Sequence, residues 1–344
     1  MKAAVVEAPM RVVVKDVPRP AEEEGTVIIK VRKFAICGSD LHIFKGTHPR
    51  IKPPIILGHE FIGEIVNCSS STPIWKIGQR VVANPLISAC GHCSYCRKGD
   101  RHLCDNSVAL GINTAGAFAE FVKVPAQNVV AVPDEVSDLE GALVEPLAVA
   151  VSAVRHARVQ LGNAVGVLGS GPIGLFCISV LKAAGACAIA ATDARKRCLE
   201  LAPQVGASKA FDAKGPWVDG IKDSFGPLDV TFIAASGGPE IAADILGGAI
   251  ELTKKEGTIF VLSNLSSKVA VDVTKLRRNH QVMTGSTSYT PNDFKLALEL
   301  IRRKAVNARA IVSHQFAFDS IEQGFDTLLH DAAAIKVLIG LPRD

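Results

Sequence analysis

Apolar runs that alternate with helix-like stretches occupy the second half of the chain, and this alternation restricts the fold more than any other feature. The runs are AVGVLG, AIAATD, DVTFIAAS, TIFVLS and QVMTGST, at residues 164–169, 188–193, 229–236, 258–263 and 281–287. Stretches of helical character separate them at residues 173–184, 195–205 and 239–253. Strands that alternate with helices in this way pair in parallel, and the helices cover both faces of the sheet. The sequence therefore predicts an α/β domain built on a doubly wound parallel sheet.

A glycine-rich turn follows the first of these runs. The stretch GVLGSGPIG, at residues 166–174, has the spacing G-x-G-x-x-G directly after a strand and at the start of a helix. Such glycines permit a tight turn and let backbone N–H groups at the helix N-terminus approach a pyrophosphate. The following strand ends in Asp193, whose carboxylate can accept hydrogen bonds from ribose hydroxyls and repels a 2′-phosphate. The predicted cofactor-binding residues are Gly169, Gly171, Pro172, Ile173, Gly174, Asp193 and Arg195.

NAD is the dinucleotide that this pattern favours. Three basic residues at 195–197 follow Asp193 and keep NADP open as the less favoured cofactor, although they are also typical of the exposed side of a helix start. A turn that binds no ligand is the alternative interpretation of the glycine motif. The strand–turn–helix context favours dinucleotide binding over that alternative.

Four of the nine cysteines lie in SACGHCSYCRKGDRHLCDN, residues 88–106, with the spacing C-x2-C-x2-C-x7-C. Spacing this regular indicates either disulfides or a bound metal rather than core packing. The N-terminal stretch MKAAVVEAPMRVVVKD is interrupted by charges and is not typical of a signal or transit peptide, so we expect a cytoplasmic chain with reduced thiols. For reduced thiols the pattern predicts a zinc site. Its predicted ligands are Cys90, Cys93, Cys96 and Cys104.

A second set of chemically active residues is dispersed along the chain. Cys37 lies in AICGSDLH, and His59 and Glu60 lie in LGHEFIGE. Each is unremarkable alone, but together they offer a thiolate, an imidazole and a carboxylate, which are the ligand types of an open catalytic zinc site. Glu145 adds a carboxylate within the apolar run GALVEPLAVA. An unpaired carboxylate there would be costly to bury, and a metal partner would remove that cost.

Several motifs together give the chain a specific resemblance that covers essentially its whole length. They are CGSDLH, GHEFIGEIV, the four-cysteine stretch, GAFAEFVKVP, EPLAVA, GSGPIG and HQFAFDSIEQGFDTLL. With them the chain resembles the zinc-dependent medium-chain dehydrogenases/reductases, nearest the branch of sorbitol, threonine and butanediol dehydrogenases. The resemblance implies a mostly β, GroES-like catalytic domain over residues 1–150 with a zinc lobe at 88–106. It further implies a Rossmann dinucleotide-binding domain over 151–287 and a return of 288–344 to the catalytic domain.

The resemblance also assigns roles to the site residues. The four cysteines of the lobe match the ligands of a structural zinc, and Cys37, His59 and Glu60 match those of a catalytic zinc. Glu145 matches the polyol-type fourth group, bound directly or through water. Ser39 matches the hydroxyl that takes the alcohol proton. His42 matches the relay that passes this proton to bulk water, with a surface histidine as the alternative interpretation.

The implied activity is that of a zinc-dependent oxidoreductase with two zinc ions per chain. It transfers a hydride between a secondary alcohol (a polyol, cyclitol or sugar-like vicinal diol) and NAD. The alternatives are a zinc-free quinone or enoyl reductase, or a non-catalytic nucleotide-binding member of the superfamily. The intact ligand set favours the zinc-dependent oxidoreductase over both. One departure concerns the substrate: sorbitol dehydrogenase carries an arginine before a tyrosine where this chain has Ser288 and Tyr289.

The predicted partners are limited to small molecules and further copies of the chain. A formal net charge of +4 over 344 residues, with basic pairs only local, does not favour nucleic-acid binding. The uncharged stretch 159–181 is interrupted by glycines, so no membrane span is expected. The resemblance implies a homodimer or homotetramer.

Overall fold

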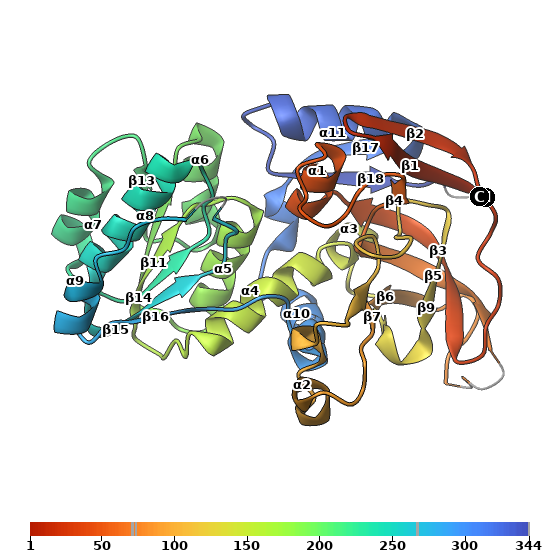
Figure 1. Cartoon of the computed structure of the whole chain (residues 1–344), viewed down its shortest axis with the longest axis horizontal. Coiled ribbons are helices and arrows are strands. Elements are labelled where there is room, and N and C mark those ends of the chain that lie inside the picture. The colour runs from red at the N-terminus through yellow and green to blue at the C-terminus, as the bar shows by residue number, and fades with distance from the viewer. Residues whose placement is uncertain (70–71, 73, 266–267, 343–344) are drawn as a thin grey trace. The chain divides into compact units, whose positions relative to one another are not determined.

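The computed structural model describes residues 1–69, 72, 74–265 and 268–342, and the chain divides into two compact units (Figure 1). The first unit comprises Met1–Glu145, Thr290–Arg302 and Val312–Asp344, and the second comprises Pro146–Tyr289 and Arg303–Ile311. The sequence placed residues 1–150 and all of 288–344 with the first domain. Residues 146–150, 288–289 and 303–311 lie in the second unit instead. In the last of these segments the 3-10 helix η3 (Ala308–Ile311) buries Ala308 and Ile311 and contacts two helices of the second unit.

A six-stranded parallel sheet forms the centre of the second unit, with the strand order β13-β12-β11-β14-β15-β16. The strands are β11 (Ala164–Leu168), β12 (Ala188–Asp193), β13 (Lys209–Asp212), β14 (Leu228–Ile233), β15 (Thr253–Val261) and β16 (Val282–Gly285). The predicted doubly wound parallel sheet is confirmed. The strand order reverses beside β11, and in such sheets ligands bind at the carboxyl ends of the strands at this reversal.

Helices connect these strands. They are α4 (Val144–His156), α5 (Pro172–Ala183), α6 (Lys196–Val205), α7 (Trp217–Phe225), α8 (Pro239–Leu252) and α9 (Val273–Arg278). The sequence predicted α5, α6 and α8 within one or two residues of their observed ends. It missed β13, α7 and α9, because four, nine and six residues are too few to show a clear apolar period.

The first unit is mostly β and contains sheets of three, seven and two strands. Its strands are β1 (Lys2–Ala8), β2 (Arg11–Asp16), β3 (Thr26–Ala35), β4 (Ile55–Ile56), β5 (Glu60–Cys68), β6 (Arg80–Ala83), β7 (Leu86–Ser88), β8 (Val108–Ala109), β9 (Phe121–Pro125), β10 (Val129–Ala131), β17 (Val312–Ala317) and β18 (Lys336–Gly340). Its helices are α1 (Gly38–Phe44), α2 (Ser94–Lys98), α3 (Asp138–Gly141), α10 (Pro291–Arg302) and α11 (Ile321–His330), with 3-10 turns η1 (Arg101–Leu103), η2 (Ala126–Asn128) and η4 (Phe318–Ser320).

Strands from both ends of the chain meet in the seven-stranded sheet, and this meeting positions the candidate site. Strand β3 lies between β5 and the C-terminal strand β18, and it pairs antiparallel with both (Figure 1). The register places Ala35 of β3 opposite Glu60 on one side and opposite Leu338 on the other. The end of β3, the start of β5 and the start of β18 therefore lie together.

An apolar core supports this junction. Phe34 stacks on Phe118 with ring centroids 4.3 Å apart, and Phe44 stacks on Phe325 at 4.4 Å. Such aromatic pairs contribute about 0.5–1.5 kcal/mol beyond the area that they bury. Phe325 belongs to α11, so the C-terminal segment contributes to the core as well as to the sheet. The sequence did not predict this helix.

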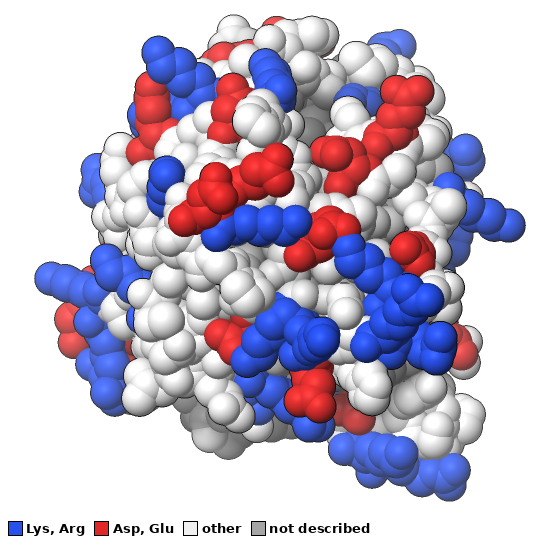
Figure 2. Space-filling model, turned by 90° about the vertical axis from the view of Figure 1, so that its left-hand side faces the viewer, with Lys and Arg blue, Asp and Glu red and all other residues white. Residues whose placement is uncertain are grey.

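Within the described residues, no helix has the length and apolar character needed to cross a bilayer. On the face drawn in Figure 2, lysine and arginine side chains are interspersed with aspartate and glutamate.

Candidate metal centres and cofactor site

Cys37, His59 and Glu60 come together at the junction of β3 and β5. One ligand atom from each lies within 4.8 Å of the others. Cys37 precedes α1 just beyond the end of β3, while His59 and Glu60 stand at the start of β5, so the pairing of Ala35 with Glu60 brings the three side chains together. His59 and Glu60 are buried. The structure thus gathers the three residues that were predicted as ligands of one metal, although their role as ligands stays a prediction.

Asp40, which the sequence analysis missed, lies beside this cluster. Its side chain is fully buried in α1, where Oδ2 accepts a hydrogen bond of 2.9 Å from the backbone N–H of Cys37. Its other oxygen lies 3.6 Å from Nδ1 of His59. Carboxylates beside metal-binding histidines commonly orient the ring, and Asp40 is placed to do so for His59. The only sequence signal for Asp40 was its place in CGSDLH.

The charge balance of this cluster suits a cation. Burial alone would lower the pKa of His59. The neighbouring side chains of Asp40, Cys37 and Glu145 raise it by more, so the pKa of His59 lies well above its usual value. Among the described residues, the buried atoms Oδ1 of Asp40 and Nδ1 of His59 form no hydrogen bond. Buried polar groups without partners are rare in native proteins, because they cost free energy. A zinc ion held by the thiolate, the imidazole and a carboxylate would offset this surplus of negative charge.

Lys336 is the second residue that the sequence analysis missed. Its ammonium group lies on β18, buried, with Nζ 2.7 Å from Oε1 of Glu60 and 3.3 Å from the carbonyl oxygen of Ile36. Loss of one partner of such a buried pair costs about 3–5 kcal/mol, because the other charge is left uncompensated. Its only sequence signal was a single charge in the apolar run AIKVLIG. Glu60 therefore has a cationic partner within the protein, and its role as a metal ligand stays a prediction.

Glu145 lies in the first turn of α4, near the cluster but outside the group of three described above. Its negative charge contributes to raising the pKa of both His59 and Lys336. This electrostatic proximity is compatible with its predicted place as a fourth group, bound directly or through water.

The predicted proton relay lies on α1. Ser39 and His42 are three residues apart in this helix, a spacing that puts two side chains on the same face. His42 is exposed, and its Nδ1 lies 3.3 Å from Oγ1 of Thr47. Ser39 is half-buried and His42 is exposed, and the proton-relay roles of both stay predictions.

The four cysteines of residues 88–106 also converge, with their sulfur atoms within 4.8 Å of one another. Backbone N–H groups point at the sulfurs: that of Cys93 donates to Cys90, that of Cys96 to Cys93 and that of Cys90 to Cys104, at 3.4–3.5 Å. The N–H groups of Cys93 and His92 lower the pKa of Cys90 to about 6. Burial and the neighbouring thiols raise the pKa of Cys96 to about 12. A metal is what allows four crowded thiols to ionise together.

This zinc lobe, residues 88–106, has almost no apolar core. Neither α2 nor η1 buries a side chain, and in the lobe, all of whose residues the structure describes, Cys104 alone is buried. A closed site of four thiolates would hold such a segment together and leave no position for a substrate.

The glycine motif lines a cavity of about 820 Å³ in the second unit. Gly169 has a φ of +100°, and a Cβ there would lie 2.5 Å from the backbone nitrogen of Ala235. A Cβ on Gly174 would lie 1.9 Å from the carbonyl oxygen of Gly169. Gly174 therefore lets α5 pack closely against the glycine turn, and it does not line the cavity. The lining includes these predicted residues: Gly169, Gly171, Pro172, Asp193 and Arg195. Ile173, in the first turn of α5, lies outside it.

Asp193 ends β12 at the rim of this cavity, and its carboxylate is already engaged. It accepts hydrogen bonds from the backbone N–H of Ser170 at 3.0 Å and of Arg195 at 2.9 Å. The Arg195 guanidinium also donates to it, at 3.1 Å and 3.3 Å. Trp217 and Lys214 line the same cavity and were not predicted, because they follow the missed strand β13. The cavity lining thus combines three acidic side chains, Asp193, Glu240 and Asp244, with the two cationic ones, Arg195 and Lys214.

Comparison with known proteins agrees with this architecture. The model of the alcohol dehydrogenase GroES-like domain matches residues 23–134, and that of the zinc-binding dehydrogenase domain matches residues 172–303. L-threonine 3-dehydrogenase of Pseudoalteromonas atlantica is 33% identical over 319 residues, which cover 91% of this chain and 92% of that protein.

Solved structures agree as well. 2R,3R-butanediol dehydrogenase from Bacillus subtilis is 31% identical, with a TM-score of 0.90 and 99% of each chain covered. A zinc-binding dehydrogenase from Sinorhizobium meliloti 1021, solved with NADP, is 30% identical, with a TM-score of 0.89 and 98% of each chain covered. On the strength of its matching domains, its relatives and its fold, the chain belongs to the zinc-dependent medium-chain dehydrogenases of the alcohol dehydrogenase family.

Proposed function

We propose that this dehydrogenase oxidises a secondary alcohol that carries a polar group on the neighbouring carbon, with NAD as the hydride acceptor. The observation that carries the proposal is the buried cluster of Cys37, His59 and Glu60, whose donor set and surplus of negative charge fit a catalytic zinc. A zinc-free reductase or a non-catalytic member of the superfamily would have no use for such a cluster.

The residues divide the work as follows. A bound zinc would supply a Lewis acid for the substrate oxygen, and a bound nicotinamide would take up the hydride. Cys37 and His59 hold the metal together with a carboxylate, and Asp40 orients the His59 ring. Ser39 and His42 carry the alcohol proton to solvent, for which an exposed imidazole is suited because it can both accept and donate a proton.

The substrate class follows from Glu145. A carboxylate beside the metal can accept a hydrogen bond from a second hydroxyl of the substrate, so a polyol, cyclitol or sugar-like vicinal diol suits the site better than a simple alcohol. Ser288 replaces the sorbitol-type arginine with a small neutral side chain, which favours neutral substrates. L-Threonine is the second candidate, because a relative that is 33% identical acts on it and its ammonium group would also suit Glu145.

A substrate panel tests this proposal. We expect neutral vicinal diols or L-threonine to give kcat/KM values at least about tenfold above those of primary alcohols and anionic hydroxy acids, since one hydrogen bond to a charged group contributes about 1.5–3 kcal/mol. The measurement is nicotinamide absorbance with both NAD and NADP. A panel led by ethanol or by an anionic hydroxy acid would show that this account of the site is wrong.

Cofactor choice depends on Asp193. Its carboxylate favours NAD, because a 2′-phosphate would approach a negative charge. We expect Asp193→Gly to raise the affinity for NADP relative to NAD by about tenfold or more, helped by the released Arg195 guanidinium. Equilibrium binding of both dinucleotides measures the shift, with Asp212→Gly as a control at the end of the neighbouring strand. If the wild type already prefers NADP, the cations at Arg195 and Lys214 outweigh the carboxylate.

Self-association and location complete the proposal. We propose a homodimer or homotetramer, which is supported by the free outer edge of β16, the last strand of its sheet, where Val282 is exposed. A cytoplasmic location is proposed because two zinc sites built on thiolates require reduced cysteines. A monomer in sedimentation equilibrium would contradict the proposed homodimer or homotetramer.

A further inference from the structure

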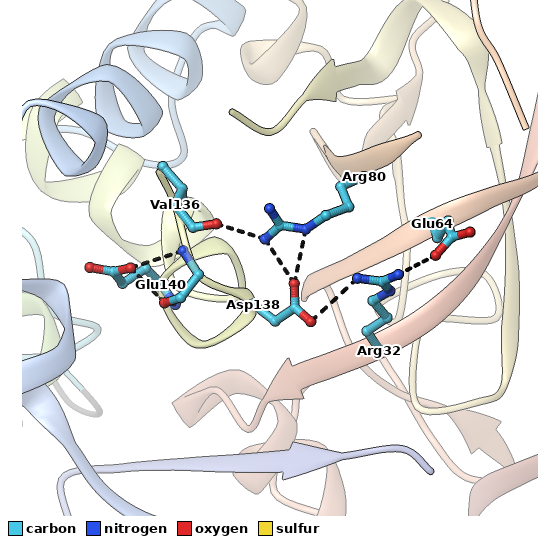
Figure 3. A network of polar contacts seen from close by, with 7 residues as sticks. Arg32, Glu64, Arg80, Val136, Asp138 and Glu140 are labelled. Atoms are coloured by element: carbon cyan, nitrogen blue, oxygen red, sulfur yellow. Dashed lines mark hydrogen bonds and ion pairs between the residues drawn. The ribbon is translucent and has the colours of Figure 1, made fainter. Parts of the chain in front are cut away.

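Asp138 lies at the centre of a network of charges that is separate from the metal cluster (Figure 3). Two arginines converge on its carboxylate: Arg80 donates from Nε at 3.1 Å and from Nη2 at 2.8 Å, and Arg32 lies 3.6 Å away. Arg80 also donates a hydrogen bond of 2.6 Å to the carbonyl oxygen of Val136, and Arg32 pairs with Glu64. The Asp138 side chain is only 10% exposed, so these contacts are poorly screened by water.

The strands that supply this network also supply the metal cluster. Arg32 lies on β3 at a register irregularity against β5, between Val31 and Lys33, and such bulges redirect a side chain. Glu64 lies on β5, the strand that begins with Glu60. The network therefore fixes α3 to β3, which leads into Cys37, to β5, which begins with Glu60, and to β6, which carries Arg80.

Packing adds a second contact between α3 and β5. A Cβ on Gly141 would lie 2.3 Å from Cδ1 of Ile62, so the glycine lets the end of α3 lie directly against β5. Ala142, Leu143 and Val144 follow and are fully buried. The next residue is Glu145. A short, fully buried stretch thus joins the Asp138 network to the carboxylate proposed as the fourth group at the metal.

We propose that Asp138 is a positioning residue for Glu145. Through Arg32 of β3 and Arg80 of β6, the strands on either side of β5, it holds α3 against this sheet. Helix α3 in turn sets how far the Glu145 carboxylate lies from the metal and the substrate. This inference rests on the proposed function, because it presupposes a metal at Cys37, His59 and Glu60. It goes beyond that function by assigning a role to a carboxylate that does not itself touch metal or substrate.

Asp138→Asn tests the proposal, because it keeps the size of the side chain but cannot balance two guanidinium groups. We expect kcat/KM to fall about tenfold or more, as is typical when a group that supports a metal site is lost. In the cobalt-substituted enzyme, we expect the visible d–d bands of the metal site to shift, since they report its ligand geometry. Glu140→Gln is the matched control: Glu140 lies in the same short helix, caps its N-terminus at Ser137 and points away from the two arginines (Figure 3).

A double-mutant cycle separates positioning from general stability. If Asp138 acts through Glu145, Asp138→Asn should have no further effect on kcat/KM or on the cobalt bands in a Glu145→Ala background. Independent, additive effects would overturn the proposal, and so would a variant that only melts at a lower temperature with unchanged cobalt bands. A wild type that takes up no cobalt at the cluster would overturn the proposed function and this inference with it. Normal cobalt uptake with Asp138→Asn bands like those of the wild type overturns this inference alone.

Discussion

His59→Ala is expected to reduce kcat by about a thousandfold or more, while binding of NADH stays close to that of the wild type. The metal at this cluster is proposed to supply several kcal/mol of transition-state stabilisation, and each 1.36 kcal/mol corresponds to a factor of ten in rate. Without His59 the site keeps Cys37 and a Glu60 that is already paired with Lys336, so metal retention should fail. The cofactor cavity is lined entirely by residues of the second unit, whereas His59 belongs to the first. Steady-state kinetics, metal analysis and NADH fluorescence measure the three quantities.

A matched control is available for this variant. His330→Ala removes an exposed histidine that pairs with Asp326 at the end of α11, and it should leave kcat and metal content unchanged. The Lewis-acid proposal fails if His59→Ala retains full activity after the metal at its site has been lost. A loss of NADH binding together with activity would instead indicate that the variant is misfolded.

Cys96→Ser is expected to have the largest effect on stability. The zinc lobe buries only Cys104, so a metal is the main interaction that can hold it folded, and in such segments metal affinity is folding free energy. The variant should lose about one zinc ion per chain from an initial two, melt at a lower temperature and aggregate more readily. Inductively coupled plasma analysis and thermal unfolding give the two readouts.

Cys187→Ser serves as the control for this variant. Cys187 is an exposed cysteine of the second unit whose thiol donates to the carbonyl oxygen of Gly162, and a serine hydroxyl can replace that bond. We expect its zinc content and melting temperature to match the wild type. Only one zinc ion per chain in the wild type, or a Cys96→Ser protein that keeps two, would argue against a structural metal in the lobe.

These two variants probe independent consequences of metal binding. The cluster of Cys37, His59 and Glu60 has a surplus of negative charge that a cation would offset. Loss of its metal should therefore reduce turnover more than stability. The lobe has four converging cysteines and only one buried residue, so loss of a metal there should reduce stability more than turnover. A protein of this fold without metals would show neither loss. His59→Ala and Cys96→Ser together are therefore a direct test against a zinc-free reductase.

Short-range patterns in the sequence were sufficient to predict much of this molecule. The parallel sheet, the glycine turn before α5 and the convergence of the lobe cysteines all follow from residues that are close in the chain. Apolar periodicity and the spacing of glycines or cysteines are local properties, because they reflect strand and helix geometry over a few residues. Cys37, His59 and Glu60 were grouped because their donor types complement one another and because their motifs resemble those of a known family.

Only the tertiary structure showed what surrounds that group. Lys336 reaches Glu60 across 276 residues of sequence because β18 pairs with β3 in one particular register, and a shift of one residue would turn its side chain to the other face of the sheet. The same holds for the convergence of Arg32 and Arg80 on Asp138, and for the placement of Arg303–Ile311 in the second unit. Ion pairs of this kind are stabilised by burial and by strand register, which depend on the whole fold. Local sequence therefore determined most of the elements around the parallel sheet and the candidate metal donors, whereas long-range pairing decided which charges surround and position those donors.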